Sequence, residues 1–340
     1  MTISRNFEAP YEHLDGASIL VTGGTGSFGK AFVKKVLSSV TPKRLVVFSR
    51  DELKQYEMNQ EFADYPNAKC LRFFIGDVRD YNRLEMAFKG IDYIFHAAAL
   101  KHVPIAEYNP FECIHTNVLG TENVVRAALN NNIKKVVSLS TDKAASPINL
   151  YGASKLASDK IIVAANNLSG RDGTLFSVVR YGNVIGSRGS VVPLFKKIAA
   201  SNTQKLPITD PRMTRFWLTL DQGVNFVNSC LTMMHGGEIF IPKIPSMKIT
   251  DLAKAIAPDI EHEVIGIRPG EKLHEIMITE DDARSTIELS DRYVILPSLG
   301  FWFYNDNPHK NSKPVGEGFC YSSDSNTEWM GVDELSEITQ

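Results

Sequence analysis

The chain has 340 residues, of which 43% are hydrophobic and 22% are charged, and its formal net charge is -2. This size and composition are typical of one large globular domain or two closely associated lobes, and the near-neutral charge argues against nucleic acid as a partner. The sequence contains no run of about 18 apolar residues, so we expect no membrane span. The N-terminal stretch MTISRNFEAPYEHLDG lacks the apolar core of a secretory signal, so we expect a cytoplasmic protein.

Apolar runs alternate with helical stretches from the N-terminus onward. Residues 18–22 (SILVT) predict a buried strand, residues 27–40 predict a helix, and residues 44–49 predict a second strand. The alternation continues through the stretches LRFFIGD, YNRLEMAFKG, IDYIFHAAA, GTENVVRAALNNN, KKVVSLST and TLFSVVRYGNVIG. This order predicts an α/β fold with a doubly wound parallel sheet of the Rossmann type.

The regular alternation ends near residue 182, and loops and prolines separate the helices that follow. We expect residues 1–182 to form the cofactor-binding domain, with residues 1–15 as a tail. Residues 183–300 are expected to form a smaller substrate lobe, with some segments returning to the first domain. Residues 301–340 are rich in turn formers and predict an irregular C-terminal extension.

The turn after the first strand contains glycines at a GxxGxxG spacing, Gly23, Gly26 and Gly29. Glycines let a backbone approach a pyrophosphate closely, and the next helix presents its N-terminal amides to that anion. We therefore predict a dinucleotide site that also includes Thr22, Ser27 and Phe28.

The end of the second strand indicates which dinucleotide binds. An NAD enzyme usually has an acidic residue there, whereas this chain has Ser49 and Arg50, followed by Lys54. Arginine can bind a 2′-phosphate, so NADP is favoured as the cofactor. NAD stays an alternative, because the acidic residue Asp51 directly follows Arg50.

Later strand ends complete the predicted cofactor site. Asp77 could accept a hydrogen bond from the adenine amino group, and Val78 could pack on the ring. The stretch after the fourth strand adds residues at the cofactor edge, namely Ala97, Ala98, Ala99 and Lys101.

Tyr151 and Lys155 are four residues apart and share one face of a predicted helix. A positive charge near a tyrosine stabilises its phenolate, so the pair can transfer a proton. The loop before this helix carries Asp142 and a second lysine, Lys143.

Several motifs resemble those of extended short-chain dehydrogenases/reductases that modify nucleotide sugars. They are TGGTGSFG, HAAALKHVP, NVLGTENV, STDKAASPINLYGASK and RYGNVIGSRGSVVPLF. The sequence resembles most closely the inverting UDP-N-acetylglucosamine 4,6-dehydratases of pseudaminic acid biosynthesis, over roughly residues 15–290.

The resemblance implies a chemical role for each residue of this region. Tyr151 would deprotonate the sugar C4 hydroxyl, to which Thr141 would hydrogen-bond, while a hydride leaves C4 for the nicotinamide. Retaining dehydratases carry Asp-Glu after the threonine, so Lys143 would replace the glutamate as the base at C5, and Asp142 would protonate the C6 hydroxyl that leaves. Crowding by Lys155 and the cofactor ring would lower the pKa of Lys143, and a proton returned to the opposite face of C5 would invert that centre.

The resemblance also implies how UDP-N-acetylglucosamine binds. Arginines would bind its diphosphate, a loop would pack near uracil, and Lys101, Thr141 and Tyr151 would also contact substrate. The further residues expected to bind substrate are Asn183, Val192, Pro193, Arg212, Arg215, Arg268 and Glu271. The resemblance further implies a homo-oligomer (a dimer or hexamer) and a product that enters pseudaminic acid biosynthesis. Whether that product serves flagellin glycosylation or another glycan stays open from sequence.

Three alternatives remain open from sequence. A C4 or C5 nucleotide-sugar epimerase would share the fold and Tyr151 but would not need Asp142 and Lys143 as an acid–base pair. A dehydratase that also epimerises C5, as in capsule pathways, is a close neighbour. An NADP-sensing Rossmann regulator could afford to lose the Tyr151–Lys155 pair, which this chain keeps.

The four cysteines, Cys70, Cys113, Cys230 and Cys320, lie far apart and form no CxxC motif. Disulfides and a zinc site are therefore poorly supported, and we expect no metal.

Overall fold

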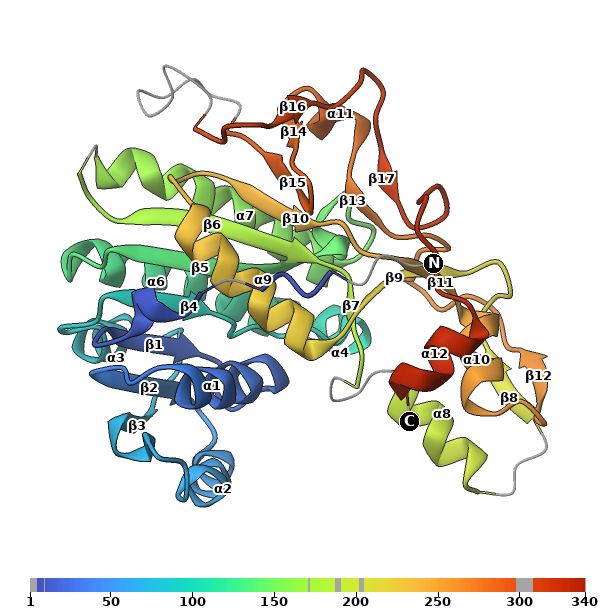
Figure 1. Ribbon diagram of the computed structural model, residues 1–340, viewed down its shortest axis with the longest axis horizontal. Coiled ribbons are helices and arrows are strands. Elements are labelled where there is room, and N and C mark those ends of the chain that lie inside the picture. The colour runs from blue at the N-terminus through green and yellow to red at the C-terminus, as the bar shows by residue number, and fades with distance from the viewer. Residues whose placement is uncertain are drawn as a thin grey trace.

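A computed structural model of the chain describes residues 5–8, 10–170, 172–186, 191–201, 205–297 and 308–339. The SRGS part of the loop expected near uracil, residues 187–190, lies outside these ranges. Figure 1 shows a large α/β body and, beside it, a smaller lobe that contains α8, α10 and α12.

The large body is built on a sheet with the strand order β16-β14-β15-β10-β6-β5-β4-β1-β2-β3. The run from β3 to β10 is parallel throughout, and β15, β14 and β16 extend it in antiparallel fashion. The parallel strands are β1 (Ser18–Thr22), β2 (Arg44–Ser49), β3 (Leu71–Ile75), β4 (Tyr93–His96), β5 (Lys135–Thr141), β6 (Leu175–Tyr181) and β10 (Ile239–Pro242). The antiparallel strands are β14 (Thr286–Glu288), β15 (Arg292–Ile295) and β16 (Lys313–Pro314). The predicted doubly wound parallel sheet is confirmed.

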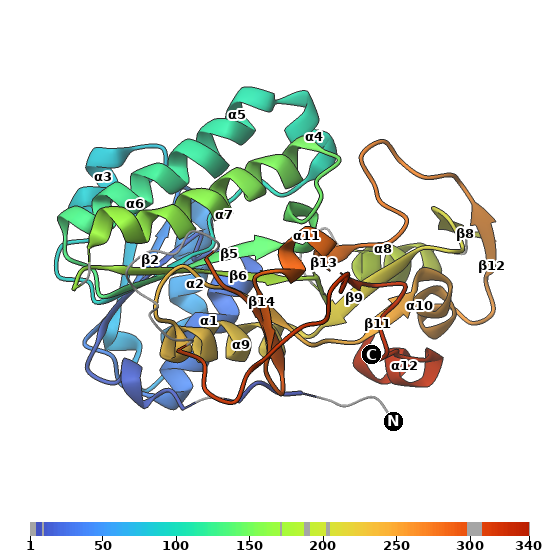
Figure 2. The same cartoon turned by 90° about the horizontal axis from the view of Figure 1, so that it is seen from above.

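Helices cover both faces of this sheet (Figure 2). One face carries α3 (Tyr81–Ala87), α6 (Gly120–Asn130) and α7 (Leu150–Ser169), with α4 (Val103–Tyr108) and α5 (Pro110–Ile114) packed against α7. The other face carries α1 (Ser27–Ser39) and α9 (Leu220–Met233), which contact each other. The helix α2 (Glu52–Phe62) packs against β2 and β3. Because both faces are covered, central strands such as β1 are buried at every position and read as continuous apolar runs.

The smaller lobe has its own hydrophobic core. Its strands are β7 (Asn183–Val184), β8 (Lys205–Ile208), β9 (Thr214–Leu218), β11 (Ser246–Lys248) and β12 (Glu261–Val264). Its helices are α8 (Val191–Ala199), α10 (Ile249–Ile256) and α12 (Val332–Thr339). Phe195, Trp217 and Leu252 are buried in this core, and Leu335 of α12 packs there too. The last segment of the chain, expected to be irregular, therefore contributes a helix to this core.

Between body and lobe lie α11 (Glu280–Ala283) and the two-stranded pair of β13 (Ile276–Ile278) and β17 (Tyr321–Ser322). The residues immediately before β13 reach the carboxyl end of β5, because β13 contacts the turn at Asp142–Ala144. This contact matters for the site described below. No helix in the described part of the chain has both the length and the apolar character needed to cross a membrane.

Candidate active site

A cleft of about 1180 Å³ lies between the carboxyl ends of the parallel strands and the smaller lobe. Its lining includes residues that follow each of the strands β1 to β6, as well as Pro207, Trp217 and Met247 of the lobe. Pockets for one small ligand usually have volumes of ~300–1,000 Å³. The cleft can therefore hold a dinucleotide together with a second ligand.

The cleft brings together most of the residues predicted from sequence. Its lining includes Gly23, Gly26, Ser27, Phe28, Gly29, Ser49, Arg50, Lys54, Asp77, Val78, Ala97, Ala98, Ala99, Lys101, Thr141, Asp142, Lys143, Tyr151, Lys155, Asn183, Pro193, Arg215, Arg268 and Glu271.

Three predicted residues do not line the cleft. Thr22 lies behind it, where its hydroxyl accepts hydrogen bonds from the backbone N–H groups of Ala97 and Ala98. Val192 is buried in the core of the smaller lobe, since it lies on the inner face of α8. The Arg212 side chain is 70% exposed and pairs with Asp210 two residues earlier. The expected substrate contacts of Val192 and Arg212 therefore do not fit their positions.

The glycine-rich turn has the geometry of a phosphate cradle. Gly23 has a φ of +64°, and a Cβ there would lie 2.8 Å from the backbone nitrogen of Ala98. Only glycine fits this close crossing of the β1 and β4 turns. The helix α1 starts directly after Gly26, which provides no side-chain cap, and Gly26, Ser27 and Phe28 line the cleft. The first amides of α1 are thus suited to a pyrophosphate.

The end of β2 presents both Arg50 and its acidic neighbour Asp51 to the cleft, and the Asp51 carboxylate is already paired. Asp51 caps α2 by accepting a hydrogen bond from the Lys54 backbone N–H, and it also pairs with the Lys54 ammonium. Arg50 is exposed and lies 3.5 Å from Asp77. Although burial opposes the effect, hydrogen bonds and charge from Arg79 lower the pKa of Asp77.

The predicted catalytic loop is a single 3₁₀ turn, Asp142–Ala144, directly after β5. Thr141 begins it, donating to Asp142 Oδ1 at 2.9 Å and accepting weakly from the Lys143 backbone N–H at 3.4 Å. The helix α7 then packs closely over the turn, since a Cβ at Gly152 would lie 2.2 Å from the Lys143 carbonyl oxygen. The glycine after Tyr151 thus allows the helix that carries Tyr151 to touch the Asp142–Lys143 turn.

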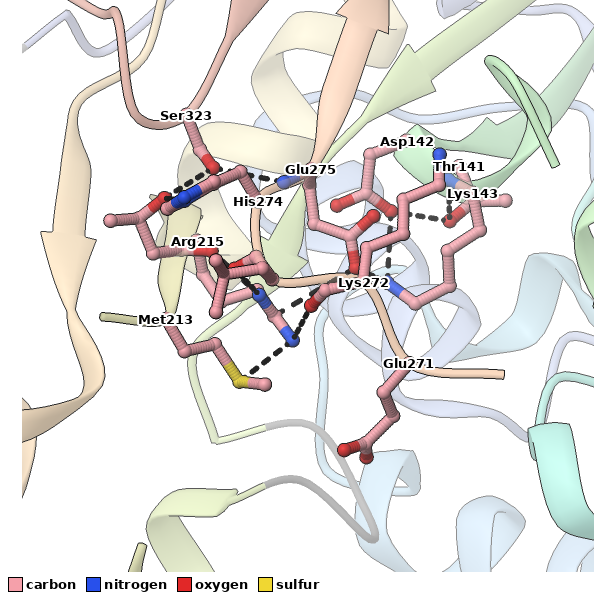
Figure 3. A network of polar contacts seen from close by, with 12 residues as sticks. Thr141, Asp142, Lys143, Met213, Arg215, Glu271, Lys272, His274, Glu275 and Ser323 are labelled. Carbon is pink, nitrogen blue, oxygen red and sulfur yellow. Dashed lines mark hydrogen bonds and ion pairs between the residues drawn. The ribbon is translucent and has the colours of Figure 1, made fainter. Parts of the chain in front are cut away.

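Lys143 lies between two buried carboxylates, one of which was not predicted (Figure 3). Its Nζ is 3.1 Å from Asp142 Oδ1 and 3.0 Å from Glu275 Oε1, and the two acidic side chains are only 2% and 1% exposed. Among the described residues, Asp142 Oδ2 and Glu275 Oε2 find no hydrogen-bond donor. We call these three residues the charge cluster.

The charge cluster has perturbed pKa values. Burial raises the pKa of Asp142, and the charge of Glu275 adds to the effect. Burial acts to lower the pKa of Lys143, but Asp142 and Glu275 outweigh it and raise this pKa above its ordinary value. Burial acts to raise the pKa of Glu275, but Lys143 and Arg215 lower it. A lowered pKa of Lys143 is expected from sequence. This expectation is wrong for this structure, because carboxylates rather than Lys155 surround the lysine ammonium.

Tyr151 and Lys155 lie on α7 and both line the cleft. Burial raises the pKa of Tyr151 to about 12, although Lys143 and a hydrogen bond with Thr141 act to lower it. Burial lowers the pKa of Lys155, and Asp159, one turn further on, opposes this. Asp159 forms a buried ion pair at 3.4 Å with Arg180 of β6, which places a carboxylate behind the lysine.

The segment that carries Glu275 is held by bonds to both lobes. Arg215 donates to the carbonyl oxygens of Lys272 and Leu273, and its Nε lies 3.8 Å from Glu275. Lys272 donates to the Ala145 carbonyl oxygen at 2.7 Å. Arg215 therefore positions the charge cluster, while Arg268 is 54% exposed and lies at 3.8 Å from Glu271. The Glu271 side chain points away from the cluster (Figure 3).

Sequence reasoning named Glu271 but missed Glu275, four residues later. One signal was present, because Glu275 directly precedes the apolar stretch IMI that forms β13, where a carboxylate is expected to be buried. Nothing local shows that its partner is Lys143.

Three features together define a short-chain dehydrogenase/reductase of the extended kind. They are the doubly wound sheet, the glycine cradle after β1 and the Tyr-x-x-x-Lys pair at the start of α7. The chain belongs to the family described as "Polysaccharide biosynthesis protein", whose profile matches residues 19–297.

Two relatives show which enzymes the chain is similar to. The chain is 56% identical to "UDP-N-acetylglucosamine 4,6-dehydratase (inverting)" of Campylobacter jejuni subsp. jejuni (strain 81-176), over 95% of this chain and 97% of the relative. It is 44% identical to "UDP-glucose 4-epimerase" of Rickettsia bellii (strain RML369-C), over 82% of each chain. The predicted resemblance to the inverting dehydratases is confirmed.

Solved structures agree with the fold. Pen from Bacillus thuringiensis matches with a TM-score of 0.87 and 40% identity, over 96% of this chain and 97% of that one. DesIV, a dTDP-glucose 4,6-dehydratase from Streptomyces venezuelae solved with NAD bound, matches with a TM-score of 0.66 and 25% identity, over 75% and 86% of the two chains.

Proposed function

We propose that this chain catalyses the 4,6-dehydration of UDP-N-acetylglucosamine with inversion at C5, giving UDP-2-acetamido-2,6-dideoxy-β-L-arabino-hex-4-ulose. The observation that carries the proposal is the buried contact of Lys143 with Asp142 and Glu275 at the edge of the cleft that Tyr151 lines. The name of the 56% identical relative supports the same reaction.

The cleft suits a nicotinamide dinucleotide, because Gly23 and the uncapped start of α1 form a phosphate cradle. When bound, this cofactor accepts a hydride from the sugar and later returns it. We propose NADP, since Arg50 is exposed near the end of β2 while the carboxylate of Asp51 is already engaged by Lys54.

Tyr151 is the proposed base for the C4 hydroxyl, and Thr141 orients that hydroxyl. Burial holds the Tyr151 pKa at about 12, so the tyrosine needs positive charge nearby to ionise. Lys143 supplies such a charge in this structure, and Lys155 lies one turn after Tyr151 on the same helix. The Asp159–Arg180 pair fixes the charge environment behind Lys155.

Elimination of water then needs a base at C5 and an acid at O6. Transfer of one proton from Lys143 Nζ to Asp142 Oδ1, across 3.1 Å, converts the ion pair into a neutral amine and a neutral carboxylic acid. Both catalytic forms arise without any net uptake or release of protons. The raised pKa of Asp142 favours this transfer, whereas the raised pKa of Lys143, caused by the charges of Asp142 and Glu275, opposes it.

Glu275 is the proposed positioning residue for this exchange. Its carboxylate holds Lys143 Nζ at 3.0 Å and shares its charge with Arg215. The lysine is thereby kept at the mouth of the turn, where its side chain remains 25% exposed. Substrate contacts are proposed for the cleft residues Asn183, Pro193 and Arg268.

A C4 epimerase is the second candidate, because a 44% identical relative carries that name. Epimerisation at C4 uses Tyr151 but gives no role to an acid–base pair at C5 and O6. The charge cluster therefore favours dehydration.

Nuclear magnetic resonance of the product separates the two. Purified protein is incubated with NADP and UDP-N-acetylglucosamine. We expect a C6 methyl signal, a C4 ketone or its hydrate, and an inverted C5. A UDP-N-acetylgalactosamine product with an intact C6 hydroxymethyl group would identify an epimerase instead.

We further propose that the product enters pseudaminic acid biosynthesis for flagellin glycosylation, and that the protein acts in the cytoplasm as a homo-oligomer. The large apolar side chains of Ile105, Tyr108 and Phe111, exposed on α4 and α5, support self-association.

A further inference from the structure

Two histidines and a glutamate converge outside the catalytic cleft. His235 and Glu238 lie in the turn between α9 and β10, and His309 comes from the chain that leads to β16. One ligand atom from each of the three residues lies within 4.8 Å of the others. The hydrogen bond from the Val178 N–H of β6 to the Glu238 carbonyl oxygen attaches this turn to the sheet.

Two of the three distances between ligand atoms in this cluster match those around a metal ion. Glu238 Oε1 lies 3.6 Å from His235 Nδ1 and 3.4 Å from His309 Nε2. Both contacts are long for an N–H···O hydrogen bond, for which ~2.7–3.2 Å is typical, although both imidazoles still act to lower the pKa of the Glu238 carboxyl. A tetrahedral zinc site with bonds of about 2.0–2.2 Å separates its ligand atoms by about 3.3–3.6 Å, which matches both distances.

Outer contacts hold the glutamate in one orientation. Its second oxygen, Oε2, accepts hydrogen bonds from Ser177 Oγ at 2.6 Å and from the Gly236 N–H at 2.8 Å. Oε1 accepts the His235 backbone N–H at 2.6 Å and faces both imidazoles. Glu238 is fully buried, and a buried carboxylate that is fixed by outer hydrogen bonds is typical of a metal ligand.

The two imidazoles differ in burial. His309 is buried, and its ring packs edge-on against the rings of Phe240 and His235. The His235 side chain is 50% exposed, so its ring can move toward an ion that enters from solvent.

We propose that His235, Glu238 and His309 bind one zinc ion, with water as the fourth ligand. Two imidazoles and one carboxylate form a ligand set that zinc prefers and that leaves one position open. None of the cysteines takes part, which is why their spacing predicts no such site. The ion would tie the chain around His309 to the start of β10.

The test uses tag-free, full-length protein that has been stripped with EDTA and dialysed. Zinc is titrated in competition with a chromophoric chelator. We expect one ion per chain, and we expect His235→Ala to weaken binding by at least tenfold, since even the loss of an outer partner costs about 10–100-fold. His115→Ala, which removes an exposed histidine elsewhere, should bind zinc as the wild type does.

Two further measurements distinguish this site from adventitious binding. Cobalt should give the visible absorption of a tetrahedral complex in the wild type and in His115→Ala, but not in His235→Ala. Excess zinc should raise the Tm of the wild type by clearly more than that of His235→Ala. Binding of zinc by His235→Ala with wild-type affinity, or the absence of stoichiometric binding to the wild type, would overturn the proposal.

Discussion

The two walls of the catalytic cleft are built in different ways. The cofactor wall consists of turns that directly follow strands, such as Gly23 after β1 and Arg50 after β2. The substrate wall depends on contacts between distant segments, such as Lys143 after β5 with Glu275 before β13. The first wall is specified locally, whereas the second exists only once these distant segments have packed together.

The walls also differ in how their charges behave. Arg50 is exposed, so its interactions are screened by solvent and each contributes little. Asp142 and Glu275 are buried, so each charge in their cluster changes the pKa values of the others. Substitutions on the substrate wall should therefore alter chemistry, and those on the cofactor wall should alter affinity.

The largest effect is expected for Tyr151→Phe, which removes the proposed base from the junction of the two walls. Loss of a general base typically lowers the rate by about 10²–10⁴-fold, and we expect kcat/KM to fall by a factor in this range. Steady-state assays of product formation measure it. Tyr56→Phe, at an exposed position on α2, is the matched control and should keep full activity. Turnover of Tyr151→Phe within about tenfold of the wild type would remove the tyrosine from the first step.

Glu275→Gln tests the substrate wall. We expect about a tenfold loss of kcat/KM, equivalent to ~1.4 kcal/mol of transition-state stabilisation. Glu275 raises the pKa of both Asp142 and Lys143, so removing its charge lowers both. In the active form, Asp142 and Lys143 share one proton, so this form exists between the pKa values of the two groups. Both limbs of the pH profile should therefore move to lower pH. A purely structural role for Glu275 would lower the rate without moving either limb.

Arg50→Ala tests the cofactor wall. Loss of a charge-assisted contact with a 2′-phosphate should weaken NADP binding by about tenfold and leave NAD binding unchanged. Calorimetric titration of cofactor-free protein measures both affinities. Arg126→Ala, on the exposed face of α6, should change neither. Equal affinities for the two cofactors in the wild type would contradict NADP preference.

The smallest effect is expected at Asn149, which links the walls. It accepts the Gly152 N–H as the cap of α7 and donates to the Gly270 carbonyl oxygen at 2.8 Å. Asn149→Ala should lower the free energy of unfolding by ~1 kcal/mol. Asn149→Asp keeps the cap and loses only the donor, so it should recover most of this stability in denaturant titrations. An aspartate variant as unstable as the alanine variant would show that the bond to Gly270 matters more than the cap.

The same contrast explains what could be predicted from sequence. The strand β1 has a continuous apolar run that ends at glycines, so both the strand and the turn that follows it can be predicted. Tyr151 and Lys155 are one helical turn apart, which fixes their geometry locally.

The substrate wall could not be predicted in this way. Val192 and Pro193 are neighbours, yet only Pro193 lines the cleft, because helical rotation places Val192 in the lobe core. Arg215 has the residue type of a phosphate ligand but donates to backbone carbonyls. The pKa of Lys143 depends on Glu275, whose proximity arises only from tertiary folding.

The most direct test of the charge cluster is exchange of the C5 hydrogen with solvent. Wild-type protein turning over UDP-N-acetylglucosamine in deuterated water should give product with deuterium at an inverted C5. Lys143→Ala, and Lys143→Met as a variant of similar volume, should slow incorporation at C5 by about 10²-fold or more while still binding NADP. Exchange at the wild-type rate in both variants would contradict the role of Lys143 as the C5 base.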